Sequence, residues 1–239
     1  MNGEGRERVA PQGSAEPAPP RSFKERLKHA THAALSPLTG MLMRMGLRPD
    51  HLTVGGLLMS LLAGLAFFEG NFHLGAMLLA VGGVCDILDG EMARRGARES
   101  TFGAFLDSTL DRLAEAAVLV GIAGFYVGHL VALVVNPAIA VHEISRGLEP
   151  PVWERVGLVA VLALIGSFMV SYTRARAEGL GLACRVGWFE RPERMVLVIV
   201  AAAFGVGPVM PAALIVLAVL SFVTTFQRMA HVWRITRDR

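Results

Sequence analysis

The sequence predicts an all-α, polytopic membrane protein with six transmembrane helices, and its composition and hydropathy pattern are the observations that predict this. Of the 239 residues, 53% are hydrophobic and only 18% are charged, which is far from the composition of a soluble globular domain. Apolar runs close to the length needed to cross a bilayer recur along the chain. They cover about residues 52–68, 73–92, 104–127, 156–173, 195–207 and 212–226.

Three parts are expected in chain order. Residues 1–20 are rich in Pro, Gly, Ala and Glu and lack the apolar region of a signal peptide, so they predict a disordered tail. Residues 21–48 mix basic and apolar positions at helical spacing and predict an amphipathic juxtamembrane helix, interrupted near Pro37. Simple anchoring of this segment to anionic lipid, without an enzymatic role, is an equal alternative. Residues 49–239 then form the six-helix membrane domain.

The connection between the third and fourth spans is long. Residues 128–152 include a further apolar patch, residues 130–141, which is broken at Asn136 and Pro137. This patch is too short and too interrupted to predict a seventh span. No function is predicted for the connection.

The distribution of basic residues predicts the orientation of the chain. Two of the loops between spans, residues 69–72 and 207–211, contain no Lys or Arg. Lys and Arg instead crowd residues 21–48, 94–98, 174–194 and 228–239. Because basic loops remain on the cytoplasmic side, we expect a multi-pass protein of the cell membrane with both termini in the cytoplasm.

Four aspartates within 26 residues are the main candidates for function: Asp86, Asp89, Asp107 and Asp111. The first two are three residues apart and the last two are four apart, so each pair shares one face of a helix. Solvated or helix-capping aspartates are the ordinary alternative, but the flanking sequence is apolar and charge at membrane depth is costly. Clustered carboxylates need a cation, and ligation by oxygen alone favours Mg²⁺, then Mn²⁺ or Ca²⁺. The sequence therefore predicts a divalent-metal site that opens to the cytoplasm.

The spacing within this stretch is specific. It reads Asp86-x2-Asp89-Gly90-x2-Ala93-Arg94-x8-Gly103-x3-Asp107-x3-Asp111. The chain thereby resembles the CDP-alcohol phosphotransferase family, in which an alcohol attacks a CDP-linked phosphoryl group. That reaction builds charge on phosphate oxygens, which metal ions can neutralise.

The small and basic residues of the signature suit such a substrate. Gly90 and Ala93 keep one helix face low, so that a nucleotide diphosphate can approach the backbone, and Arg94 can pair with phosphate. Close helix packing is the alternative explanation for the two small residues.

The resemblance extends over about residues 21–236 through LRPDHLTVGG, SYTRARAEGLG, WFERPERM and TTFQRMAHVW. These segments resemble the phosphatidylinositol phosphate synthase branch of the family. In that branch myo-inositol 1-phosphate displaces CMP from CDP-diacylglycerol, and the resemblance implies a homodimer in the lipid bilayer with no nucleic-acid partner.

The resemblance also implies roles for individual residues. It implies that Asp86, Asp89, Asp107 and Asp111 ligate two Mg²⁺, with Mn²⁺ as a possible substitute, and that Asp111 is also the proton acceptor. For the CDP-lipid it implies Asp50, His51, Leu52, Thr53, Gly90, Ala93, Arg94, Ser100 and Gly103. For the acceptor phosphate it implies Ser171, Arg174, Arg194 and Arg228.

Two features leave the acceptor open. Arg174 stands where the resembling branch has Lys, which exchanges a compact ammonium for a bidentate guanidinium. The arginines at 174–194 are also explained by membrane topology alone. A phosphatidylglycerophosphate synthase, or another enzyme for a polyol phosphate, is therefore the alternative within the family, although the RPER and QR segments favour a polyhydroxylated phosphate.

Two more distant functions are disfavoured. An intramembrane prenyltransferase also uses aspartate-rich motifs with Mg²⁺, but its two motifs lie on widely separated helices. A cation transporter is expected to have internal repeats and a site near the bilayer midplane, and neither is visible in the sequence.

Overall fold

The computed structural model describes residues 35–95, 100–136, 138, 141, 144–145 and 150–237. The predicted tail, residues 21–34 of the predicted juxtamembrane segment and part of the 128–152 connection lie outside these residues. Throughout the described part the secondary structure is helical, and it includes no strand. The predicted all-α class is therefore confirmed.

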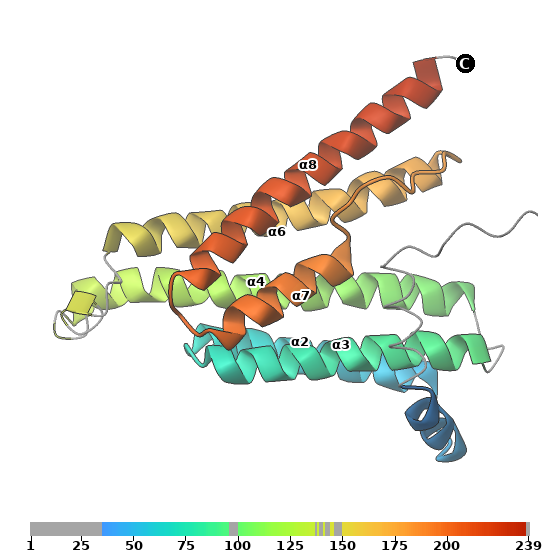
Figure 1. Ribbon diagram of the computed structural model, residues 1–239, viewed down its shortest axis with the longest axis horizontal. Coiled ribbons are helices and arrows are strands. Elements are labelled where there is room, and N and C mark those ends of the chain that lie inside the picture. The colour runs from blue at the N-terminus through green and yellow to red at the C-terminus, as the bar shows by residue number, and fades with distance from the viewer. Residues whose placement is uncertain are drawn as a thin grey trace, which may run out of the picture.

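Six helices form the body of the protein (Figure 1). In chain order they are α2 (Pro49–Phe68), α3 (Phe72–Arg95), α4 (Thr101–Val135), α6 (Pro150–Gly179), α7 (Arg191–Ala203) and α8 (Val209–Arg237). Residues 35–44 are also helical, and Pro37 lies within the first turn of that described stretch. The helices α2, α3, α4, α6 and α8 are each long and apolar enough to cross a membrane, which confirms a membrane protein.

The predicted count of six complete spans is not confirmed. The apolar run predicted at residues 195–207 corresponds to α7, which has only 13 residues. A helix of that length rises about 20 Å, whereas the hydrocarbon core of a bilayer is about 30 Å thick. α7 ends at Ala203, and the positive φ of 77° at Gly205 then turns the chain toward α8.

Local sequence determines where the helices that carry the signature begin. Pro49 occupies the first turn of α2, where its missing N–H costs nothing. Ser100 is the N-cap of α4, and its hydroxyl accepts a hydrogen bond from the Gly103 N–H at 2.9 Å. Such a cap satisfies one of the unpaired donors at the helix start.

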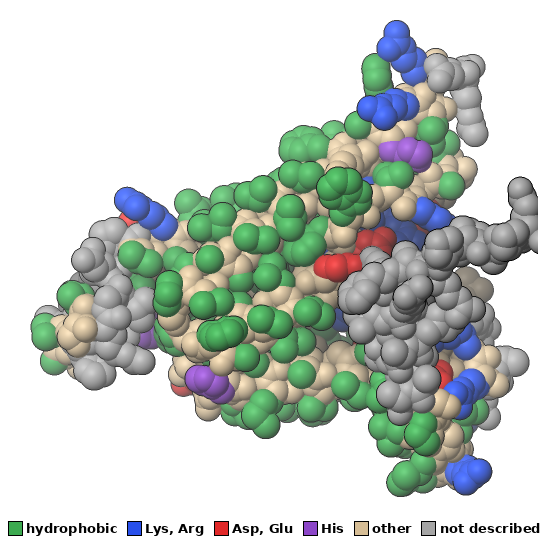
Figure 2. Space-filling view, viewed as in Figure 1, with side chains coloured by type: hydrophobic (Ala, Val, Ile, Leu, Met, Phe, Trp, Pro, Cys, Tyr) green, Lys and Arg blue, Asp and Glu red, His purple; other side chains and the backbone are tan. Residues whose placement is uncertain are grey.

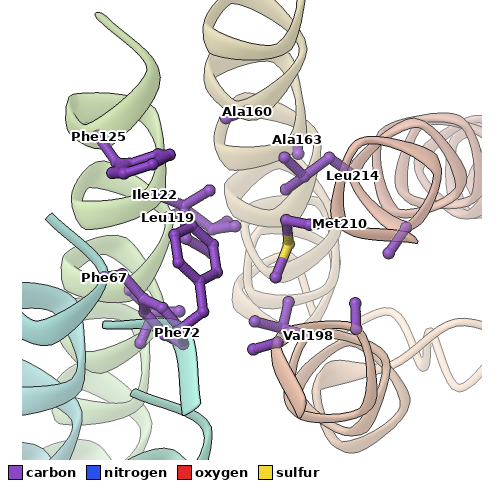
Figure 3. Packing of buried hydrophobic residues seen from close by; sticks show 14 of the residues in the cluster. Phe67, Phe72, Leu119, Ile122, Phe125, Ala160, Ala163, Val198, Met210 and Leu214 are labelled. Carbon is purple, nitrogen blue, oxygen red and sulfur yellow. The ribbon is translucent and has the colours of Figure 1, made fainter. Parts of the chain in front are cut away.

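The helices pack in a chain of neighbours. α2 lies against both α3 and α4, α4 lies against α6, and α6 lies against α8, while the short α7 connects α3 with α8. The buried core lies where these helices meet (Figure 3). There Phe72 packs between Phe67 and Phe125, with ring centroids 5.3 and 5.1 Å away.

The surface agrees with a membrane setting. Figure 2 shows hydrophobic side chains spread over the middle of the helices, with most Lys and Arg toward the end where the C-terminus lies. The ends of α3 and α6 and the start of α4 lie at that same end (Figure 1). The helical stretch 35–44 joins it there, because the Arg95 guanidinium donates to the Ser36 hydroxyl at 2.6 Å.

Two glycines allow α2 and α4 to approach very closely. A Cβ built on Gly64 would lie 2.5 Å from the carbonyl oxygen of Ala117, and one built on Gly121 would clash with the backbone of Gly64. Small residues commonly allow such backbone approach between membrane helices. This contact holds the middle of α4 beside α2.

We expect Gly121→Ala to destabilise the protein by about 1–3 kcal/mol, because the added methyl group would force α2 and α4 apart. Thermal unfolding in detergent would measure the loss. Gly128→Ala is the matched control on the same helix, since nothing lies within 4 Å of its Cβ position. Equal melting temperatures for the two variants would contradict the close approach.

Candidate active site

Three of the predicted aspartates meet at one point. Asp86 and Asp89 project from α3 and Asp107 from α4, and one carboxylate oxygen of each lies within 4.8 Å of the others. Because α2 packs against both helices, it holds the two aspartate-bearing faces in position. The structure thus brings together three of the four carboxylates that the sequence predicts to meet.

The donor set fits a divalent cation. Asp89 is 6% exposed, and the Thr53 hydroxyl orients it by donating to its Oδ2 at 2.7 Å. The Oδ1 atom of Asp107 is buried and has no hydrogen-bond partner among the described residues. A buried, unsatisfied carboxylate oxygen is costly. Three carboxylates together favour binding of a hard cation such as Mg²⁺ or Mn²⁺.

The fourth aspartate has a different partner. The Nη1 atom of Arg191 lies 2.7 Å from Oδ1 of Asp111 and 3.2 Å from Oδ2 of Asp86. Arg191 is not among the residues predicted for the site. One signal was available, because Pro192 marks a helix start and thereby places Arg191 at the helix end nearest the other basic residues.

The signature residues line a cavity of about 250 Å³ between α2, α3 and α4, which we call the signature cavity. Its wall contains every residue predicted for the CDP-lipid except His51 and Leu52: Asp50, Thr53, Gly90, Ala93, Arg94, Ser100 and Gly103. The ring of His51 instead accepts a hydrogen bond from the Arg48 N–H at 3.3 Å. His51 therefore supports the start of α2.

The signature glycines face this cavity. A Cβ on Gly90 would come within 4 Å of only the Arg94 guanidinium, and one on Gly103 would meet only the Ser100 hydroxyl. No neighbouring helix demands a glycine at either position, in contrast to Gly64 and Gly121. Close packing against a neighbouring helix therefore does not explain Gly90 or Gly103.

A second cavity, of about 190 Å³, collects the residues predicted for the acceptor phosphate, and we call it the arginine cavity. Ser171 and Arg174 come from α6, Arg194 from α7 and Arg228 from α8, and all four line it. Arg112, Arg191, Asp111, Glu115 and Glu190 share its wall. Such a concentration of guanidinium groups suits an anion.

Arg194, which is predicted to bind the acceptor phosphate, is already paired with a carboxylate. Its guanidinium is 1% exposed and binds the Glu115 carboxylate at two points, 2.6 and 2.9 Å away. The Ser167 hydroxyl donates to the same carboxylate. Glu115, which the sequence analysis missed, lies four residues after Asp111 and so on the same face of α4. Direct phosphate binding by Arg194 stays a prediction.

Arg174 and Arg228 face each other across Glu190. Oε1 of Glu190 lies 4.0 Å from Nη1 of Arg174 and 3.8 Å from Nη2 of Arg228. Arg228 is 2% exposed and also donates to the carbonyl oxygens of Val186 and Val170. These bonds fix the Arg228 guanidinium in the wall of the cavity.

A third, mostly apolar cavity of about 300 Å³ adjoins the other two. Thr53 and Asp89 line both this apolar cavity and the signature cavity. Asp111 and Arg191 line both the apolar cavity and the arginine cavity. The carboxylate cluster therefore lies between a site built from the signature and a site built from arginines.

Proteins of similar sequence have related names. The chain is 40% identical over 195 residues to the archaetidylinositol phosphate synthase of Methanothermobacter thermautotrophicus, covering 80% of this chain and 86% of that protein. It is 36% identical over 211 residues to the phosphatidylinositol phosphate synthase of Streptomyces avermitilis, covering 84% and 78%.

Solved structures agree with the fold. The phosphatidylinositol phosphate synthase of Mycobacterium tuberculosis, with CDP-DAG bound, is 32% identical with a TM-score of 0.66, and the match covers 82% of this chain and 92% of that one. A second structure of that enzyme, with manganese and citrate, gives a TM-score of 0.67 at 30% identity, covering 82% and 88%. Residues 47–235 match CDP-alcohol phosphatidyltransferase. The chain therefore belongs to the CDP-alcohol phosphatidyltransferase family.

Proposed function

We propose that the protein transfers the phosphatidyl group of CDP-diacylglycerol to a polyol phosphate, myo-inositol 1-phosphate, giving phosphatidylinositol phosphate and CMP. The observation that carries this proposal is the position of Asp111, which lines the arginine cavity and also the apolar cavity that contains Asp86 and Asp89. A carboxylate in that position is within reach of both an acceptor and a donor.

The CDP-lipid donor fits the signature cavity and the apolar cavity beside it. The signature cavity offers Arg94 for phosphate and low helix faces at Gly90 and Gly103 for the nucleotide. The apolar cavity adjoins it through Thr53 and Asp89, which suits a substrate with a polar head and apolar chains. A relative is known with CDP-DAG bound.

The aspartates would hold the metal. We assign two Mg²⁺, or Mn²⁺ in their place, to Asp86, Asp89, Asp107 and Asp111, and a relative is known with manganese. When bound, such ions neutralise charge on phosphate oxygens and align the reacting groups. The Thr53 hydroxyl contributes by keeping Asp89 oriented.

The acceptor phosphate fits the arginine cavity. The two kinds of relative share "inositol phosphate" in their names and differ in the lipid part. The acceptor's phosphate would bind in the arginine cavity, with its hydroxyl toward Asp111. As the bond from this oxygen to phosphorus forms and the bond to CMP breaks, Asp111 takes the hydroxyl proton.

We also propose an orientation in the membrane and an oligomeric state. Basic residues gather at the end that bears the aspartates, so we place the site and both termini on the cytoplasmic side of the cell membrane. We also assign a homodimer on the basis of the family. Light scattering of the detergent-solubilised protein, corrected for detergent, would report its oligomeric state.

An acceptor panel tests the function. Purified protein with CDP-diacylglycerol and Mg²⁺ should release CMP with inositol 1-phosphate, and much less with glycerol 3-phosphate, serine or free inositol. Because the relatives differ in lipid, the panel is repeated with a CDP-linked archaeal lipid as donor. Activity with glycerol 3-phosphate alone would establish the alternative, a phosphatidylglycerophosphate synthase.

Neutralising Arg174 should weaken the binding of the acceptor and leave the binding of the CDP-lipid unchanged. We expect Arg174→Met to raise the acceptor KM about 10- to 150-fold, since a hydrogen bond to a charged group contributes about 1.5–3 kcal/mol. The KM for CDP-diacylglycerol should change little, and Arg174→Lys should retain activity with inositol 1-phosphate. Arg176→Met, an exposed position on the same helix, is the matched control. A parallel rise in both KM values would refute the assignment.

A further inference from the structure

Arg191 makes the tightest contact to the carboxylate cluster among the described basic residues, and the proposed reaction does not yet use it. Its Nη1 atom bridges Asp111 on α4 and Asp86 on α3, at 2.7 and 3.2 Å. Arg191 is the first residue of α7, the short helix that packs against α3. One positive charge is thus shared between two carboxylates that the proposed function assigns to metal.

Its position divides the cluster into two parts. Asp86, Asp89 and Asp107 form the group whose oxygens converge, whereas Asp111 is turned toward the guanidinium. A cation held by Asp111 would have to replace Arg191 there, because a guanidinium and a divalent ion in contact with the same carboxylate repel each other. Arg191 therefore stands where a second ion would be held.

The guanidinium also has an unused donor. The Nε atom of Arg191 is buried and has no hydrogen-bond partner among the described residues. Arg191 lines the arginine cavity as well as the apolar one. A phosphate group in the arginine cavity would offer it an acceptor, and a buried donor gains most from such a partner.

We propose that Arg191 is an internal counter-ion of the aspartates. It binds Asp86 and Asp111 before both divalent cations are bound. It then releases Asp111 to the second cation and binds the acceptor phosphate. This inference rests on the proposed cation site. Before metal binds, Arg191 offsets part of the negative charge of the cluster, and its release links metal loading to acceptor binding. A first cation at Asp86, Asp89 and Asp107 meets Arg191 only at Asp86, where the contact is longer than at Asp111, 3.2 against 2.7 Å.

Metal binding without turnover tests the first half. Mn²⁺ titrations of the full-length protein in detergent, followed by electron paramagnetic resonance, should show two classes of site in the wild type. In Arg191→Met the weaker class should bind about tenfold more tightly, which corresponds to about 1.4 kcal/mol. Thioether sulfur is a poor ligand for Mn²⁺, so the substituted side chain cannot itself explain the gain.

Two further variants identify the cause. Arg191→Lys keeps the charge and should bind Mn²⁺ within about threefold of the wild type, a difference under 0.7 kcal/mol. Arg185→Met removes the same charge from an exposed position in the preceding loop and should leave the isotherm unchanged. Equal tightening in the Met and Lys variants of Arg191, or an unchanged isotherm in Arg191→Met, would overturn the counter-ion role.

The second half predicts an opposite effect on the acceptor. At saturating Mg²⁺, Arg191→Met should raise the KM for inositol 1-phosphate about tenfold while the KM for CDP-diacylglycerol is unchanged, as expected for loss of one charge-assisted hydrogen bond. An unchanged acceptor KM would overturn the transfer to phosphate. Failure of the wild type to bind any Mn²⁺ would overturn the proposed metal site together with this inference, whereas metal binding that is unaffected by Arg191 would leave the proposed function standing.

Discussion

Replacing Asp111 with asparagine is expected to lower kcat by about 10² to 10⁴, the usual contribution of a positioned general base. Asparagine keeps the shape of the side chain and one oxygen, but it cannot take the proton of the acceptor hydroxyl. CMP release at saturating substrates would measure the loss. CDP-diacylglycerol should still bind, because its nucleotide is assigned to the signature cavity, which Asp111 does not line.

Asp111 is also assigned to metal, so its two roles must be separated. The same assay is therefore run over a wide range of Mg²⁺ concentration. If Asp111 acts as the base, saturating Mg²⁺ leaves kcat low. Recovery of the wild-type rate at high Mg²⁺ would show that Asp111 is a ligand only.

Replacing Glu115 with alanine is expected to destabilise the protein by about 3–5 kcal/mol, the usual cost of leaving one partner of a buried ion pair alone. Arg194 is 1% exposed, and among the described residues its charge would keep only the Phe189 carbonyl oxygen, at 3.3 Å, as an acceptor. Ser167 would lose its partner as well. The melting temperature in detergent should fall sharply.

Two comparisons make this result specific. Glu178→Ala removes the partner of an exposed ion pair with Arg174, 2.9 Å long, and exposed pairs contribute about 0–1 kcal/mol. The double variant Glu115→Leu with Arg194→Met should recover much of the loss, since apolar replacement of a whole buried pair is often neutral. A double variant no more stable than Glu115→Ala would mean that the unpaired charge is not the cause.

The ion pair between Glu115 and Arg194 also affects how the arginine cavity would bind the acceptor phosphate. Glu115 and Ser167 fix Arg194 from one side of the arginine cavity, while the carbonyl oxygens of Val170 and Val186 fix Arg228 from another. The guanidinium groups are therefore oriented before an anion arrives. Preorganised donors of this kind need little rearrangement on binding, which is how such sites gain affinity and rate.

The sequence by itself determined the helical class and predicted a site of four carboxylates, three of which converge in the structure. Helical spacing places Asp86 and Asp89 on one face and Asp107 on another, and charge at membrane depth has few explanations other than a site. The resemblance to the family signature identified Gly90 and Gly103, and a motif with fixed gaps within one helix-loop-helix depends on short-range geometry. These features involve residues close together in the chain.

Only the tertiary structure decided which cations those carboxylates meet. Arg191 reaches Asp86 across 105 positions and Arg194 reaches Glu115 across 79, and no helical period relates residues so far apart. The short α7, which was expected to be part of a full span, places both arginines at the level of the aspartates. A buried charge must find its partner in three dimensions, so the pairing depends on how α3, α4 and α7 pack and not on the pattern within any one of them.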